Sequence, residues 1–174
     1  CLKFLENTLE GEYHNITINT YMRNIEEYNQ MLTNYDFWSQ IKEEHIIIFQ
    51  LDTLFLRSPT SQHMNYDFNG AVCGSLNREK EFIINGGLSY RSKKAMLTAC
   101  NLIDNSYDVM PEDIIFTKLM RKHKQLFKLP SIAECNDFSI ETIGNFDSVI
   151  GIHGTDKYYI LDKTIYQMLM ETKV

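Results

Sequence analysis

The run His45–Asp52, which reads HIIIFQLD, is the feature that most constrains the fold. It is short, continuously apolar and rich in β-branched residues, a pattern typical of a strand buried on both faces, as in a parallel sheet under helices. Asp52 ends the run, and ligands of open α/β sheets bind outside the carboxyl ends of the strands. A carboxylate at that place can ligate Mg²⁺ or Mn²⁺, but it can equally cap the following loop.

Helices are predicted on both sides of this strand, because apolar residues recur there every three or four positions. The predicted spans are about 21–33 with Asn19 or Thr20 as N-cap, Ser92 to about Ile103, Pro111 to about Lys122, and about 161–172. Two further strands are predicted over 67–72 and 148–153. Intermixed strands and helices indicate an α/β fold, and a length of 174 residues favours a single domain spanning 1–174.

The composition limits the classes of function. A net charge of −6 argues against a protein that grips nucleic acid. The sequence contains no apolar run approaching the roughly 20 residues of a transmembrane helix. Four widely spaced cysteines favour a reducing compartment, so we expect a cytoplasmic protein, or one that is membrane-associated or secretory through segments not present here. Because the chain begins with Cys1 rather than Met, we expect a fragment or an N-terminally incomplete domain.

Two further segments could carry chemistry. Asn85, Gly86 and Gly87 allow positive φ angles and a close approach of backbone to ligand, although a simple turn explains them as well. Glu112 and Asp113 could supply a general base, although acidic residues in a first helical turn also complement the helix dipole.

Two single residues are also candidates. His153 ends an apolar run, and its imidazole could ligate a metal ion, although a lone histidine is more often structural. Arg91 could bind phosphate or carboxylate through its planar guanidinium group, or could be a surface residue ahead of a helix. The sequence contains no GxGxxG, P-loop or nucleophile-elbow motif, which argues against Rossmann, P-loop and serine-hydrolase functions.

Taken in order, these segments resemble a family of uncharacterised glycosyltransferase-like domains, catalogued largely as a domain of unknown function. The resemblance covers roughly residues 22–155 and is carried by six ordered segments. They are 28–32 with 37–38 and 47–52, then 66–71 (similar to "YDYIGAP"), 85–92 ("NGGLSLRS"), 111–116 ("PEDVFF"), 138–141 ("FSVE") and 151–153 ("GFH").

The resemblance implies a GT-A-type, Rossmann-like fold, with a mixed, mostly parallel sheet flanked by helices, and it allows for the absence of the first N-terminal strands. It implies transfer of a sugar from a nucleotide-sugar donor to a hydroxyl of a glycan, protein or small molecule. An Asp-x-Asp motif would correspond to Gln50-Leu51-Asp52, with the first acid replaced, so a divalent cation (Mn²⁺ or Mg²⁺) would be held by Asp52 and His153.

The same resemblance assigns further roles. Glu112 and Asp113 would be catalytic, and the residues binding donor or acceptor would be Gln50, Asp52, Asp67, Asn85, Gly86, Gly87 and Arg91. Two alternatives stay open at this point. One is a non-catalytic module that binds glycans or nucleotide sugars within a larger protein, which the lost acid favours. The other is a metal-dependent phosphoesterase on the same α/β layout.

Overall fold

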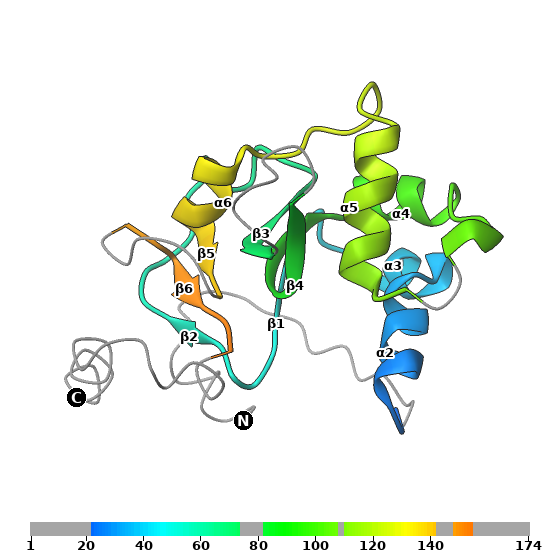
Figure 1. Ribbon diagram of the computed structural model, residues 1–174, viewed down its shortest axis with the longest axis horizontal. Coiled ribbons are helices and arrows are strands. Elements are labelled where there is room, and N and C mark those ends of the chain that lie inside the picture. Colours follow the sequence, from blue (N-terminus) through cyan, green and yellow to red (C-terminus); the bar gives the residue numbers. More distant parts are fainter. Residues whose placement is uncertain (1–21, 74–81, 108–109, 142–147, 155–174) are drawn as a thin grey trace.

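The computed structural model describes residues 22–73, 82–107, 110–141 and 148–154. Those residues form a mixed α/β structure with two small sheets (Figure 1). The helices are α2 (Ile25–Leu32), α3 (Tyr35–Gln40), α4 (Lys93–Cys100), α5 (Glu112–Lys122) and α6 (Ile132–Phe138), with a 3-10 helix at Asn105–Tyr107. The strands are β1 (His45–Phe49), β2 (Leu54–Phe55), β3 (Phe68–Cys73), β4 (Ile83–Ser92), β5 (Ser139–Ile140) and β6 (Gly151–Ile152).

The larger sheet has the order β1-β4-β3, and both of its strand pairs are antiparallel. The smaller sheet has the order β2-β6-β5, in which β2 and β6 are antiparallel while β5 and β6 are parallel. An α/β structure was therefore predicted correctly, but the described strands do not make a mostly parallel sheet.

The prediction that the strand at His45–Asp52 is buried on both faces was wrong. Strand β1 ends at Phe49, pairs only with β4 among the described strands, and has exposed residues at both ends with half-buried ones between. An unbroken apolar run does not distinguish a central strand from a half-covered edge strand. The helices explain the difference, because α4 and α5 pack on β4 and α6 packs on β3.

Strand β4 contains a large irregularity at the glycine pair. Two steps along β3, from Gly70 to Val72, face five steps along β4, from Ser89 back to Ile84. A bulge of this kind leaves the extra residues unpaired and re-aims their side chains. The sequence indicated a turn around Asn85-Gly86-Gly87, but the segment lies inside one continuous strand.

Most helix boundaries follow the capping chemistry of the sequence. The Ser92 side chain accepts a hydrogen bond from the backbone N–H of Ala95 and begins α4 as predicted, and Pro111 precedes α5 as predicted. Helix α2 begins later than predicted, with Asn24 as its cap. The predicted caps at 19 and 20 and the predicted helix over 161–172 lie outside the described residues.

Helix α6 and the short strands β2 and β5 were not predicted. A sequence signal existed for α6, because Ser131 and Glu134 form a capping box in which each side chain bonds the other residue's backbone N–H. The late strand, predicted over 148–153, is reduced to β6. Two-residue strands carry no periodicity that a sequence could reveal.

Two apolar clusters hold the layers together. The larger one joins the sheet to α3, α4 and α5, and includes Trp38, Phe68, Ile84, Met96 and Phe116. The smaller one packs Leu88 and Tyr90 of β4 against Phe138 and Ile150. The carboxyl end of β1, the bulge of β4 and the end of β6 are thus anchored on packed elements.

Candidate functional site

The centre of the candidate site is Gln50, directly after β1. Its backbone N–H donates to the carbonyl oxygen of Gly87 at 2.8 Å, which ties it to the bulge of β4. Its side-chain Oε1 lies 3.0 Å from Nε2 of His153, and Asp52 Oδ1 lies 3.4 Å from the same nitrogen. Three predicted segments that are far apart in sequence therefore meet at one point.

The imidazole of His153 is buried at this point, with only 3% of its side chain exposed. The positive φ of 74° at Gly154 turns the chain just after it. A β-carbon on Gly87 would lie 2.1 Å from Nε2, so only glycine leaves room for the ring. The sequence suggested positive φ at this glycine pair, but no described glycine except Gly154 has it, and the requirement at Gly87 is steric.

The other side of His153 faces Glu141, which sequence reasoning left without a role. Glu141 Oε1 lies 3.4 Å from Nδ1 of His153, and Oε2 accepts a hydrogen bond from the Cys73 thiol at 2.5 Å. Burial, followed by the hydrogen bond to Glu141, raises the pKa of Cys73 to about 12. Cys73 is thus held as a neutral thiol that donates to the carboxylate.

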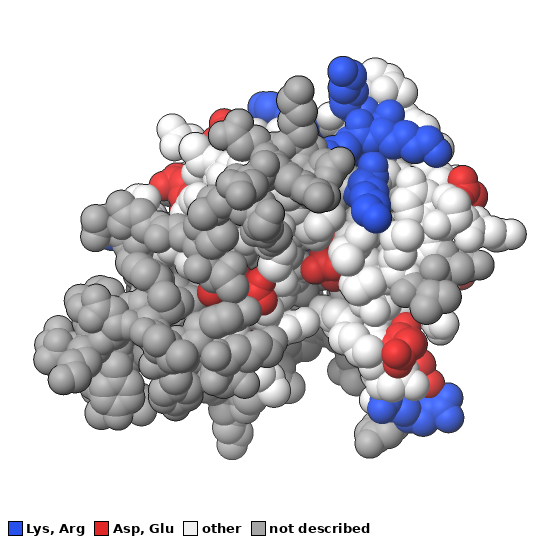
Figure 2. Space-filling model, in the orientation of Figure 1, with Lys and Arg blue, Asp and Glu red and all other residues white. Residues whose placement is uncertain are grey.

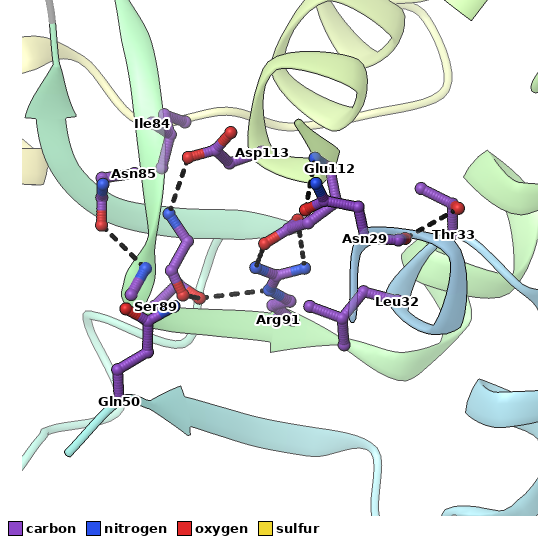
Figure 3. A network of polar contacts seen from close by, with 12 residues as sticks. Asn29, Leu32, Thr33, Gln50, Ile84, Asn85, Ser89, Arg91, Glu112 and Asp113 are labelled. Carbon is purple, nitrogen blue, oxygen red and sulfur yellow. Dashed lines mark hydrogen bonds and ion pairs between the residues drawn. The ribbon is translucent and has the colours of Figure 1, made fainter. Parts of the chain in front are cut away.

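Asn85 links this cluster to the bulge of β4. Its Nδ2 donates to Cys73 Sγ at 3.6 Å. Its Oδ1 accepts from the backbone N–H of Gly87 at 2.7 Å (Figure 3). Asn85 therefore fixes the conformation of the bulge and couples it to Cys73 and Glu141.

Asp113, in the first turn of α5, approaches the same bulge. Its carboxylate accepts hydrogen bonds from the backbone N–H groups of Gly86 (3.3 Å) and Ile114 (2.7 Å). Burial, followed by the charge of the neighbouring Glu112, raises the pKa of Asp113 above its ordinary value. A raised pKa suits a general base, because a carboxylate whose pKa lies closer to neutral pH takes up a proton more readily.

Unlike Asp113, Glu112 forms a buried ion pair with Arg91. Both guanidinium NH₂ groups of Arg91 donate to the Glu112 carboxylate at 2.9 Å, and Nε donates to Ser89 Oγ at 3.1 Å (Figure 3). The guanidinium also lies over the rings of Trp38, Phe68 and Phe116. Arg91 has no exposed surface.

This ion pair supports the bulge rather than facing a ligand. A β-carbon on Gly86 would lie 2.3 Å from Glu112 Oε1 and 2.8 Å from a guanidinium nitrogen of Arg91, so the glycine lets the pair pack against the strand. The predicted ligand contact of Arg91 and the predicted catalytic role of Glu112 stay predictions, and in this geometry the two charges are paired with each other in the core.

The structure does not bring Asp67 to this group. Asp67 lies just ahead of β3, where its carboxylate accepts from the backbone N–H of Lys128 and its carbonyl accepts from that of Ser92. Ser92 is the last residue of β4, five positions from Gly87, which corresponds to about 17 Å along a strand. Asp67 joins two loops at the far end of the sheet.

Tyr28 of α2 is a second residue that sequence reasoning left without a role. Its hydroxyl is near enough to Gln50, Arg91, Glu112 and Asp113 for these residues to affect its pKa. Burial is the largest effect and raises the pKa of Tyr28. The helical spacing of Tyr28 identified it only as an inward-facing residue.

Two side-chain atoms at this place, His153 Nε2 and Asp52 Oδ1, have the spacing that a divalent cation requires of its ligands. Two ligand atoms of one cation, each at about 2.1 Å, lie roughly 3.0–3.4 Å apart. The 3.4 Å between His153 Nε2 and Asp52 Oδ1 fits that spacing. Within the described ranges, no group of three or more His, Cys, Asp or Glu residues could hold a metal ion. A cation here would have two protein ligands and would depend on ligand oxygens or water.

Two other surface features lie away from this group. A cavity of about 390 Å³ opens beside the start of α4, where Glu44 already accepts from Ser92 Oγ and the N–H of Lys94. Lys and Arg side chains gather where α5 ends, which includes Arg121 and Lys122 of its last turn (Figure 2). Cations at that end complement the helix dipole.

The fold and the site define a mixed α/β protein with a buried histidine between carboxylates at the end of a strand. The chain belongs to the family described as "Protein of unknown function (DUF5672)", which matches residues 12–153. No curated protein and no solved structure matches the chain. Within the described residues, no helix has the length and apolar character needed to cross a membrane. Membership in a family of unknown function is thus shown, and the glycosyltransferase-like character stays a prediction.

Proposed function

We propose that this protein is a glycosyltransferase that moves a sugar from a nucleotide-sugar donor to a hydroxyl acceptor. The observation that carries the proposal is the meeting of Asp52, His153 and the Asn85–Gly87 bulge around Gln50. These segments are separate in sequence, and a glycosyltransferase of the GT-A type needs them at one place. The type of reaction is taken from the sequence resemblance to glycosyltransferase-like domains.

The arrangement of the larger sheet supports the proposed fold type. Strands β1 and β3 lie on either side of β4 and are both antiparallel to it, so they run in the same direction. A mixed sheet of the GT-A type would contain such a triplet, with its remaining strands beyond β1. The proposed site lies at the end of β1, where a ligand of an α/β sheet is expected.

In the proposed reaction, Asp113 acts as the general base. It takes the proton of the acceptor hydroxyl while that oxygen bonds to the anomeric carbon and the bond from this carbon to the diphosphate breaks. Its raised pKa and its contact with Gly86 support this role over that of Glu112, which neutralises Arg91. Glu112 holds the bulge to which Asp113 is attached.

The donor diphosphate would lie near Asp52 and His153, and these two residues would hold Mn²⁺ or Mg²⁺. Such a cation neutralises the charge that develops on a departing diphosphate. Gln50 and Tyr28 would hydrogen-bond the donor, because both place polar groups at the end of β1. Gln50 adds no negative charge, so the cation would depend on the donor for the rest of its ligands.

A thermal-shift screen of nucleotide sugars, with and without Mn²⁺, tests the proposal. A donor at 100 times its Kd stabilises the folded state by about 2.7 kcal/mol, which raises the Tm of a chain of this size by roughly 5–11 °C. The matching donor is then tested for transfer by the release of its nucleoside diphosphate.

The same assays on Asp52→Ala complete the test, with the exposed Glu26→Gln as the control. We expect D52A to fold and lose transfer, and E26Q to retain transfer. Full transfer by D52A, or no shift of the wild-type Tm with any donor, would overturn the proposal.

A second candidate function is a non-catalytic module that binds nucleotide sugars or glycans. The observation in its favour is that one acid stands at 50–52 and that, among the described residues, Asp52 and His153 are the His and acid side chains found at the proposed cation position. Such a module would show a saturable Tm shift with a donor and no release of nucleoside diphosphate under any acceptor condition.

A further inference from the structure

The two ring nitrogens of His153 face different groups. Nε2 faces Gln50 and Asp52 in the proposed donor site, while Nδ1 faces Glu141 at 3.4 Å. The two atoms do not form a hydrogen bond, and Nδ1 is buried with no hydrogen-bond partner among the described residues. Since His153 and Glu141 have only 3% and 9% of their side chains exposed, bulk water cannot easily satisfy that nitrogen.

We propose that Glu141 is a positioning residue, which accepts the Nδ1 proton of His153 and fixes the ring so that the lone pair of Nε2 faces Gln50 and Asp52. A carboxylate behind a histidine sets both the orientation of the ring and the nitrogen that carries the proton. Any effect of Glu141 on sugar transfer rests on the proposed function, whereas its effect on the ring proton of His153 does not depend on that function.

Glu141 suits this role because its own carboxylate is held. The Cys73 thiol donates to Oε2, which directs Oε1 toward His153, and Asn85 donates to the sulfur of Cys73. Glu141 is therefore placed by β3 and β4, the strands that also carry the bulge.

The contacts close into a ring around the site. From Asn85 they continue to the N–H of Gly87, from the carbonyl of Gly87 to the N–H of Gln50, and from the Gln50 side chain back to His153. A change at Glu141 should therefore be felt at Nε2 of His153, although the Glu141 carboxylate faces Nδ1, the other nitrogen of the ring. This expectation separates positioning from a merely structural role.

The proposal fixes the orientation of the Gln50 carboxamide. When Nδ1 carries the proton, neutral Nε2 is an acceptor, so the carboxamide must turn to present its NH₂ group in place of the Oε1 that lies 3.0 Å from Nε2. A cation or a donor hydroxyl that binds at Nε2 then displaces this NH₂ group and takes the lone pair. When Nε2 carries the proton instead, that lone pair is lost.

Long-range ¹H–¹⁵N NMR of the imidazole rings tests the proposal in the protein without added ligand. Spectra are recorded at pH about 8.5, where free imidazole is neutral. His153→Gln assigns the signals. We expect the wild-type protein to carry the proton on Nδ1. We expect Glu141→Gln, which keeps the size but lets the amide NH₂ face Nδ1, to shift the proton to Nε2. Glu141→Asp, which keeps the carboxylate, should restore the Nδ1 proton at least in part.

Asp137→Asn is the matched control, because Asp137 faces Nε2 of a different buried histidine, His63, at 3.2 Å. It should change the signals of His63 and leave those of His153 unchanged. In E141Q the signals of His63 should stay as in the wild type, which shows that the fold is intact. A wild-type His153 without a proton on Nδ1, or one whose protonated nitrogen is the same in a folded E141Q variant, overturns the proposal.

Binding of Mn²⁺ alone, measured by electron paramagnetic resonance, adds a second readout. Loss of a group behind a metal-ligating histidine typically weakens binding about 10- to 100-fold. We expect a loss of that size in E141Q and no loss in D137N. Equal Mn²⁺ affinity in wild type and E141Q counts against the positioning role. If the wild-type protein binds no Mn²⁺ without a donor, the cation depends on the donor for its ligands, and the NMR result alone decides the role of Glu141.

Discussion

The buried ion pair between Arg91 and Glu112 gives the sharpest prediction about stability. Arg91 has no exposed surface, Glu112 has 4% of its side chain exposed, and both guanidinium hydrogen bonds are 2.9 Å long. Glu112→Ala leaves a buried guanidinium without its counter-charge. Breaking a buried pair in this way costs about 3–5 kcal/mol, a large share of the roughly 5–15 kcal/mol that stabilises a folded protein.

Chemical and thermal denaturation measure this loss. For a chain of this length, 3–5 kcal/mol lowers the Tm by roughly 6–20 °C. Replacing both members by apolar residues, as in Arg91→Met with Glu112→Leu, should recover much of the loss, because the double variant removes both charges. Arg23→Ala is the matched control, because it breaks an exposed i,i+4 pair with Glu27, for which about 0.5 kcal/mol or less is expected.

The stability losses of these variants, compared with one another, decide whether the ion pair between Arg91 and Glu112 is structural. If E112A loses less than about 1 kcal/mol, or no more than R23A, the guanidinium finds another partner or reaches water, and the structural assignment of the pair is refuted. The same result would return Glu112 to the list of catalytic candidates. A large loss of stability in E112A that the double variant partly reverses would show that Glu112 is structural. Of the two neighbouring acids, Asp113 would then remain as the candidate for catalysis.

Two further predictions concern the bulge and Asp113. Gly87→Ala places a β-carbon where Nε2 of His153 lies. We therefore expect the free energy of unfolding to fall by about 1–3 kcal/mol in denaturation and the NMR signals of His153 to shift. Unshifted His153 signals would refute the steric role of Gly87. Burial raises the pKa of Asp113, so its ionised form destabilises the fold at neutral pH, and that penalty disappears as the pH falls through the folded-state pKa. Asp113→Asn should therefore be most favourable relative to wild type near pH 7 and lose that advantage near pH 4, as measured by urea midpoints; a difference that does not change with pH would contradict the raised pKa.

The sequence predicted elements best where local chemistry decides them. Ser92 and Pro111 mark helix starts through their own side chains, and both predictions agree with the structure. The run His45–Asp52 was predicted as a strand for good reason, but its place in the sheet depends on which strands and helices cover it. No pattern within eight residues contains that information, and so the predicted burial on both faces and the mostly parallel sheet were wrong for the described strands.

The candidate site shows the same division. The sequence identified Gln50, Asp52, the Asn85–Gly87 segment and His153, and the structure brings them together. Glu141 was missed as a site residue because a single acid directly after a two-residue strand has no periodicity or spacing that marks it. Its role appears only when β3 and β6 place Cys73 and His153 on either side of its carboxylate.

In the proposed correspondence with an Asp-x-Asp motif, the replacement of an acid by Gln50 has a physical explanation in its contacts. Its Oε1 lies 3.0 Å from Nε2 of His153, while Asp52 and Glu141 already lie 3.4 Å from the two nitrogens of that ring. A carboxylate at position 50 would be a third negative charge around one buried imidazole, which costs free energy unless a cation is always present. A carboxamide fills the same volume, contacts Nε2 of His153 and adds no charge. Under the proposed function, Mn²⁺ or Mg²⁺ would then arrive with the donor rather than stay permanently bound.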